Sequence, residues 1–157
     1  MFYHLPYMRS TAADASRGSP PAMELTMPIY VATADAPKPF SNYSQAVEVP
    51  PAARLLYVSG QVGVELDGTI PDNEKLQHEL AWRNVLAILR SQGLSAHDLV
   101  DCHVYITRPG SVGIYREVRD RMLDGARPAA TLLVVAGLAD PRLVVEVSVV
   151  AASTPSG

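Results

Sequence analysis

The sequence is poor in cysteine, in charge and in long apolar runs, and each shortage excludes a class of protein. The single cysteine, Cys102, excludes an internal disulfide, and its place in an apolar alternation favours a small buried hydrophobe over a nucleophile. No apolar run approaches the roughly 18 residues of a membrane span. The net charge of -3 gives no basic surface for nucleic acid. We therefore expect a cytoplasmic protein without a membrane or nucleic-acid partner.

The chain has 157 residues, of which 48% are hydrophobic and 18% charged, and this composition predicts one compact domain. Residues 1–26 are small and polar, show no hydrophobic periodicity and lack the apolar segment of a secretory signal. We expect residues 1–26 to form a flexible extension, residues 27–152 the domain and residues 153–157 a loose tail.

Two apolar stretches with polar groups set into them dominate the first half of the domain. Residues 40–47 carry Tyr43, and residues 55–62 end in Ser59-Gly60-Gln61, with Pro50-Pro51 between the two stretches. Prolines at such a corner are typical of a connection where no ladder donor is needed. We expect two antiparallel strands whose hydroxyl and amide groups converge on a polar ligand.

Hydrophobic periodicity predicts an α+β protein. Strands are expected at 29–31, 43–47, 55–62, 99–107, 130–135 and 143–151, and helices at 73–92 and 111–123. Two helices on one face of a mixed sheet form a single layer, which leaves the other sheet face without a cover. The nearly continuous apolar runs of the last two strands predict that both of their faces are covered. Association with further copies of the chain is the simplest cover.

The histidines do not predict a metal site. His97 and His103 have no ligand spacing to Cys102 or to a carboxylate. His78 and Trp82 lie off the centre of the apolar stripe of the first helix, so we expect a solvated histidine and a tryptophan at the edge of the core. Ser111 is expected to cap the second helix.

Three short motifs carry a family resemblance. The chain reads YSQAV at 43–47, SGQ at 59–61 and VEV at 145–147, with both predicted helices between the last two motifs. In this order and spacing the chain resembles the RidA/YjgF family of small imine and enamine hydrolases over residues 29–151. The resemblance implies a chorismate-mutase-like fold, a homotrimer whose sheets close around a barrel, and sites in clefts between subunits. It implies neither a metal nor a cofactor.

The resemblance assigns catalytic roles to Glu146, Tyr43 and Ser59. Glu146 stands alone in an apolar strand, where a carboxylate is costly unless it faces a polar cleft. There it could orient or deprotonate water, whereas the alternative is a solvated or arginine-paired carboxylate. Tyr43 and Ser59 offer hydroxyls to a substrate or a water molecule. Their alternatives are an interface aromatic and a hydroxyl that bonds its own backbone.

The chain departs from the family at its carboxylate-binding position. The family's deaminases carry an arginine at the start of the penultimate strand, and here that position is Ala130. Leu132 stands where a cysteine is frequent, and Tyr115 stands where some members place an asparagine near the substrate. Arg127 is a candidate replacement on the preceding loop, although we expect it to face solvent. These four residues are the predicted substrate-binding set.

Loss of the arginine has an energetic consequence. A hydrogen bond to a charged group contributes roughly 1.5–3 kcal/mol, so a bidentate pair is worth several kcal/mol. The sequence therefore favours a larger or less charged substrate than 2-iminopropanoate. The first hypothesis is a RidA-like hydrolase that releases ammonia from an enamine, imine or related small metabolite. The alternative is a non-catalytic small-molecule-binding trimer, and the acidic chain disfavours a third possibility, a ribonuclease.

Overall fold

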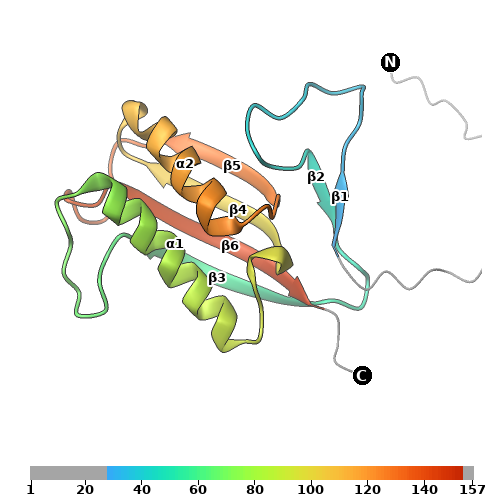
Figure 1. Cartoon of the computed structure of the whole chain (residues 1–157), viewed down its shortest axis with the longest axis horizontal. Helices are drawn as coiled ribbons and strands as arrows, with labels where there is room; N and C mark the ends of the chain where they lie inside the picture. Colours follow the sequence, from blue (N-terminus) through green and yellow to red (C-terminus); the bar gives the residue numbers. More distant parts are fainter. Residues whose placement is uncertain (1–27, 154–157) are drawn as a thin grey trace, which may run out of the picture.

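The structure is a computed structural model that describes residues 28–153. Figure 1 shows two helices lying on one face of a sheet. The strands are β1 (Ile29–Val31), β2 (Ala46–Glu48), β3 (Arg54–Val62), β4 (Leu99–Ile106), β5 (Ala129–Val134) and β6 (Val145–Ser153), and the helices are α1 (Glu74–Ser91) and α2 (Val112–Leu123). The predicted extension over 1–26 and residues 154–157 of the predicted tail lie outside the described residues. Ser153, the first residue of that predicted tail, is instead the last residue of β6.

The main sheet is mixed and has the strand order β3-β6-β4-β5. β6 runs antiparallel to both β3 and β4, whereas β5 runs parallel to β4. α2 forms the crossover between β4 and β5, as a parallel pair requires. The predicted α+β architecture, with both helices on one sheet face, is confirmed, and the trimer stays a prediction.

Local sequence signals explain where α1 begins and ends. The Asn73 side chain accepts a hydrogen bond from the Leu76 amide at 3.0 Å and caps the first turn. At the other end Gly93 adopts φ +71°, and the Leu94 amide donates to the Leu89 carbonyl at 2.9 Å. This left-handed glycine followed by an apolar residue is the common way to close a helix.

The core lies between the helices and the sheet. β4 contributes Cys102, Val104 and Ile106, and β6 contributes alternate residues from Val145 to Ala151. Burial raises the pKa of the Cys102 thiol, so the predicted role of a buried hydrophobe fits its surroundings.

The predicted pairing of residues 40–47 with 55–62 is wrong. β2 pairs with β1 in a separate two-stranded sheet, and β3 pairs with β6. Tyr43 lies in a bend before β2, not in a strand. Ser44 instead forms an isolated bridge to Ala129. The turn at Pro50–Ala53 leads the chain into β3, the edge strand of the main sheet that pairs with β6.

Two predictions about helix side chains are also wrong. His78 and Trp82 both have an exposed fraction of 0%. The histidine is therefore not solvated, and the tryptophan lies inside the core rather than at its edge. One face of α1 packs on the sheet and a neighbouring face packs on α2. The hydrophobic pattern of α1 alone does not predict the second contact. Ser111 occupies the N-cap position of α2, as expected, but its hydroxyl donates to the Glu74 carboxylate and forms no capping hydrogen bond with the helix.

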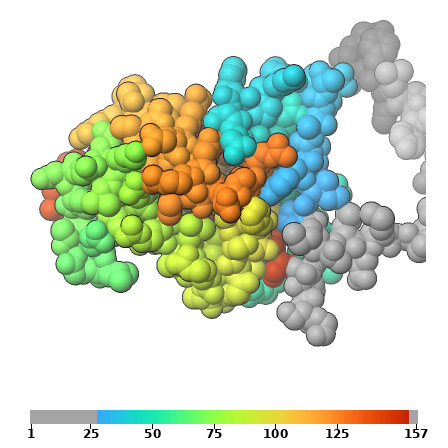
Figure 2. All heavy atoms as spheres, viewed as in Figure 1, coloured from blue at the N-terminus to red at the C-terminus, as the bar shows by residue number. Residues whose placement is uncertain are grey.

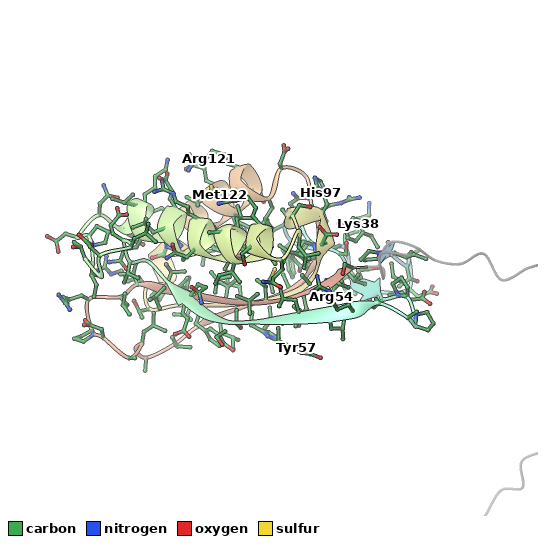
Figure 3. The ribbon with its side chains drawn as sticks, turned by 90° about the horizontal axis from the view of Figure 1, so that it is seen from below. Lys38, Arg54, Tyr57, His97, Arg121 and Met122 are labelled. Atoms are coloured by element: carbon green, nitrogen blue, oxygen red, sulfur yellow. The ribbon has the colours of Figure 1, made fainter. Side chains whose placement is uncertain are left out.

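The sheet face away from the helices is open. Figure 3 shows Tyr57 projecting from the side of the sheet that the helices do not cover. Tyr57, Leu133 and Leu55 are 74%, 50% and 44% exposed. Within one chain this face of β5 is therefore not covered, and the predicted cover by further copies stays a prediction. Neither helix of residues 28–153 is long and apolar enough to cross a membrane.

Candidate functional site

The predicted site residues divide between two hollows on opposite faces of the main sheet. The first, here called the Glu146 groove, has a volume of about 450 Å³ and opens on the face without helices. Gly60, Tyr105, Glu146 and Ser148 come from three adjacent strands, and the loop over 135–139 completes the wall. The second hollow lies on the helix side of β5.

Glu146 is half-buried and faces the groove from the middle of the sheet. Its register partners are Tyr105 on β4 and Val62 on β3. Within residues 28–153 its carboxylate has no hydrogen bond and no ion pair. Gly60 makes room for it, because a Cβ at position 60 would overlap Glu146 Oε1 and lie 2.7 Å from its Cδ. The groove therefore holds an unpaired carboxylate on a shaped floor.

Ser59 lies beside this groove, where the β3–β6 register shifts between Val58 and Gln61. The side chain is exposed, and the Ser59 carbonyl accepts from Gln61 Nε2 at 3.1 Å. No hydrogen bond of the Ser59 hydroxyl occurs among the described residues. Ser59 is not itself among the residues that line the groove, and its contact with a ligand stays a prediction.

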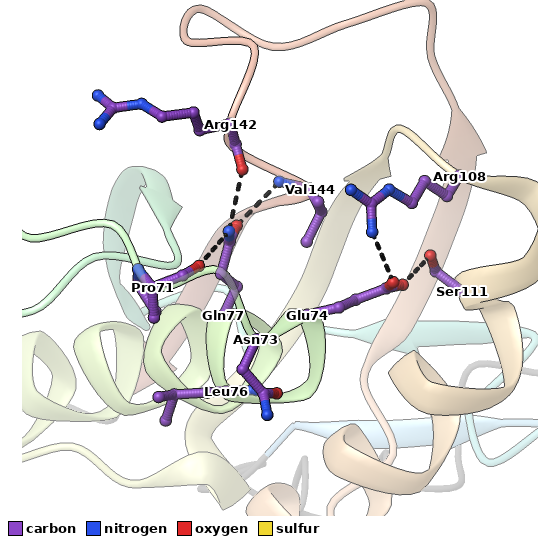
Figure 4. A network of polar contacts seen from close by, with 9 residues as sticks. All are labelled: Pro71, Asn73, Glu74, Leu76, Gln77, Arg108, Ser111, Arg142 and Val144. Atoms are coloured by element: carbon purple, nitrogen blue, oxygen red, sulfur yellow. Dashed lines mark hydrogen bonds and ion pairs between the residues drawn. The ribbon is translucent and has the colours of Figure 1, made fainter.

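Gln77 of α1 holds the segment between the loop over 135–139 and the start of β6, as Figure 4 shows. Gln77 Nε2 donates to the carbonyls of Pro71 at 2.8 Å and Arg142 at 2.9 Å. Its Oε1 accepts from the Val144 amide at 2.9 Å. Gly63 allows the approach, since a Cβ there would lie 2.6 Å from the Gln77 Cα. One buried amide thus fixes the chain that enters β6 two residues before Glu146.

A second contact in Figure 4 joins the first turn of α1 to the start of α2. The Glu74 carboxylate accepts from the Ser111 hydroxyl and, at 2.9 Å, from Arg108 Nη1. The Ser111 hydrogen bond, followed by the Arg108 contacts, holds the pKa of Glu74 below its usual value. This carboxylate is structural, because it lies outside both hollows.

The second hollow, here called the Tyr43 pocket, has a volume of about 230 Å³. The loop before β2 contributes Phe40, Ser41 and Tyr43, and β5 contributes Ala130 and Leu132; three residues of α2 close the wall. In Figure 2 the cyan atoms of this loop lie against the orange atoms of α2 and β5. Ala130 and Leu132 share the helix-side face of the sheet with Cys102 and Val104, their partners on β4.

Ser44 holds the loop of the Tyr43 pocket against β5. Its amide donates to the Pro128 carbonyl at 3.2 Å, and its hydroxyl donates to the Arg127 carbonyl at 2.5 Å. The Tyr43 hydroxyl accepts from the Phe40 amide at 3.3 Å. The hydroxyl proton of Tyr43 is not used in that bond and is available to a ligand.

Two residues of α2 define the inner wall of the Tyr43 pocket. Tyr115 is buried, and this burial raises the pKa of its hydroxyl. Arg119, one turn further along, is 4% exposed and lies 5.6 Å from the centre of the Tyr115 ring. The sequence reasoning missed Arg119. A cation four residues after Tyr115 was the local sequence feature, and by itself it does not predict burial.

Arg127 lies in neither hollow. Its guanidinium carbon is 5.9 Å from the centre of the Tyr30 ring, and its side chain is exposed. The structure thus brings Tyr43, Tyr115, Ala130 and Leu132 together, and places Ser59 beside the groove of Glu146. It separates these two sets by the sheet. No cluster of three or more possible metal ligands occurs within residues 28–153.

Comparisons with known proteins agree with this architecture. A family model described as Endoribonuclease L-PSP matches residues 33–153. The 2-iminobutanoate/2-iminopropanoate deaminase of Mus musculus is 30% identical over 110 residues, which are 69% of this chain and 79% of the mouse protein. RidA from the Antarctic bacterium Psychrobacter sp. PAMC 21119 superposes with a TM-score of 0.60 at 30% identity, covering 78% of this chain and 98% of that one. E. coli TdcF with bound serine gives a TM-score of 0.61 at 27% identity, covering 80% and 99%. The chain therefore belongs to the RidA/YjgF family, which the Endoribonuclease L-PSP model describes.

Proposed function

We propose that this protein is a RidA-like hydrolase that cleaves the C–N bond of a small enamine or imine and releases ammonia. The observation that carries the proposal is the Glu146 carboxylate. It is half-buried, has no partner among the described residues and faces a groove whose floor is shaped for it by Gly60. A carboxylate kept unpaired in a cleft is costly for stability and useful for moving a proton.

The proposed reaction needs few groups. An enamine is protonated at carbon to give the iminium ion, whose carbon is electrophilic. The oxygen of a water molecule bonds to this carbon while a water proton passes to Glu146. That proton then moves to nitrogen and the C–N bond breaks, while the new hydroxyl group releases its proton to solvent and so balances the proton that solvent supplied to the enamine carbon; a carbonyl product and ammonia leave. The hydroxyls of Tyr43 and Ser59 orient the substrate and the water.

The separation of the two hollows supports a site built from two copies of the chain. Within one protomer the sheet lies between Glu146 and Tyr43, so a single substrate cannot contact both. A neighbouring copy that covers the open sheet face would bring its own Tyr43 pocket to the Glu146 groove. The exposed Tyr57, Leu55 and Leu133 favour such a cover. We therefore propose a homotrimer with three such clefts.

The names of two relatives support the reaction class. The mouse relative is named as a deaminase of 2-iminobutanoate and 2-iminopropanoate, and TdcF is described with bound serine. Both kinds of ligand join a nitrogen to a small carbon skeleton. A ribonuclease, which the family description suggests, would have to bind a polyanion with a chain of net charge -3.

Turnover of freshly generated 2-aminoacrylate tests the proposal. Wild type is expected to release ammonia, and Glu146→Gln, which keeps the size of the side chain, is expected to lose roughly 100-fold or more of the rate. Glu79→Gln on α1, away from both hollows, is the matched control and should keep full rate. A wild type that binds small ligands yet releases no ammonia from any enamine or imine supports the non-catalytic alternative instead.

Mixed assemblies test whether the site spans two chains. Glu146→Gln removes one half of the proposed cleft, and Ala130→Trp fills the other. Each variant alone should be inactive, whereas random co-assembly should restore about a quarter of the clefts. Co-assembled protein without any recovered activity would refute the two-chain site.

A further inference from the structure

We propose that Arg119 of α2 is the anion-binding residue of the Tyr43 pocket and takes the place of the arginine absent at position 130. The inference deepens the proposed function, on which it rests, by naming the side chain that binds a carboxylate on the substrate. It reverses the expectation from the sequence that loss of the family arginine selects a less charged substrate.

The first observation is the burial of the guanidinium. Arg119 is 4% exposed, and arginine is seldom so buried without several compensating contacts. Asp120 Oδ1 accepts from Nε at 2.9 Å and from Nη2 at 2.6 Å, and Ser41 Oγ accepts from Nη2 at 2.8 Å. The Tyr115 ring lies against the guanidinium at 5.6 Å. These contacts fix the plane of the guanidinium.

The second observation is the free edge of that guanidinium. Nη1 forms no hydrogen bond within residues 28–153, although Nε and Nη2 do. Since Arg119 lines the Tyr43 pocket, the N–H groups of Nη1 are available to an acceptor inside it.

The third observation concerns the other hydrogen-bond donors and charges that line the pocket with Arg119. Ser41 Oγ accepts a hydrogen bond from Arg119, which leaves its own proton to donate. The Tyr43 hydroxyl also keeps its proton free to donate, because it accepts a hydrogen bond from the Phe40 amide. Arg116 adds a second cation to the wall, and no wall residue is acidic. Asp120 is exposed on its far side, at 46%, so solvent screens part of its charge.

The opposite wall is apolar and decides the orientation of the ligand. Ala130 and Leu132 present only carbon to the pocket. A carboxylate held by Arg119, Ser41 and Tyr43 would direct its carbon skeleton toward these two side chains. An arginine at position 130 would hold the carboxylate at the β5 side instead. The pocket would therefore still bind a carboxylate, but from the α2 side rather than from the β5 side.

Binding of 2-oxobutanoate to the full-length protein tests the assignment, with its uncharged methyl ester as the matched ligand. Isothermal titration calorimetry should give tighter binding of the acid. Arg119→Met should weaken the acid roughly ten- to hundredfold and leave the ester within about twofold. Arg121→Met, on the same helix and outside the pocket, is the control and should not change either affinity. The double variant Arg119→Met, Ala130→Arg should regain binding of the acid.

Equal affinity of wild type and Arg119→Met for the acid would overturn the assignment, as would a wild type that binds the acid no better than the ester. If Arg119→Met proves unfolded, Tyr43→Phe removes a companion donor without touching Arg119, and Ser41→Ala removes a second donor together with one hydrogen bond of Arg119 Nη2. Each should weaken the acid roughly fivefold, and unchanged affinity in both would equally overturn the assignment. Binding through Arg119 without ammonia release refutes only the proposed reaction; ammonia release without dependence on Arg119 refutes only this inference.

Discussion

The Glu146 carboxylate lies in the space that a side chain at position 60 would occupy. An added Cβ at Gly60 overlaps Glu146 Oε1 and approaches its Cγ to 2.9 Å. The glycine of the SGQ motif therefore determines where the proposed base stands, although it contributes no functional group of its own.

Gly60→Ala should move the carboxylate without removing it. A misplacement of about 1 Å can cost roughly 100-fold in rate, so we expect a fall of that order in ammonia release with ligand binding to the Tyr43 pocket preserved. Gly113→Ala, an exposed position of α2 with free space around it, is the matched control. It should keep full rate and raise stability by about 0.5–1 kcal/mol. Full activity in Gly60→Ala would contradict this role.

Gln77→Met should destabilise the protein by about 2–3 kcal/mol. The variant keeps the volume of the side chain but leaves the Pro71 and Arg142 carbonyls and the Val144 amide without their partner. Urea unfolding measures the loss, and Gln92→Met at the exposed end of α1 should stay within about 0.5 kcal/mol of wild type. The loop beside Glu146 should also exchange its amide hydrogens faster; equal exchange would argue against its attachment through Gln77.

His78 should make stability depend on pH. Burial lowers the pKa of His78 below its ordinary value of 6.5, and the charge of Glu74 opposes this only in part. Near pH 6.5 the unfolded chain binds a proton that the folded protein does not, so the free energy of unfolding falls as the pH decreases below 6.5. His78→Leu should flatten this slope in denaturant titrations between pH 7 and 5, whereas His97→Asn on the surface should retain it. An unchanged slope in His78→Leu would contradict the prediction.

Tyr57→Asp should dissociate the proposed assembly. A charge at this exposed position would be buried if a second copy covers the open sheet face, at a cost of several kcal/mol per site. Light scattering should then report a smaller particle. Arg83→Asp, on an exposed position of α1, should leave the particle size unchanged. An identical mass for wild type and Tyr57→Asp would show that this face is not the interface.

Signals carried by neighbouring residues predicted much of the fold. The helix expected at 73–92 agrees closely with α1, because the signals that end a helix lie within one turn of its ends. The alternation from Val100 to Ile106 predicted which side of β4 is buried. Pairing partners were less accessible: residues 40–47 and 55–62 are close in sequence, yet each pairs with a strand that lies elsewhere along the chain.

The residues predicted for the site divide between two hollows, and their functional roles stay predictions. Tyr43, Ala130, Leu132 and Tyr115 do meet in one pocket. The position of Glu146 on the opposite sheet face follows from strand register, which a one-residue shift would invert. Arg119 could not be recognised from its helix alone, because its burial depends on Ser41, which lies 78 residues earlier.

The contacts between Ser44 and the start of β5 have a consequence for solubility. β5 is an edge strand, and an unprotected edge is a template on which foreign strands can add. Ser44 occupies the beginning of that edge by pairing at Ala129 and bonding the carbonyls of Pro128 and Arg127. The loop that forms the wall of a binding pocket thus also shields the sheet from aggregation at this end, so selection for either property preserves the other.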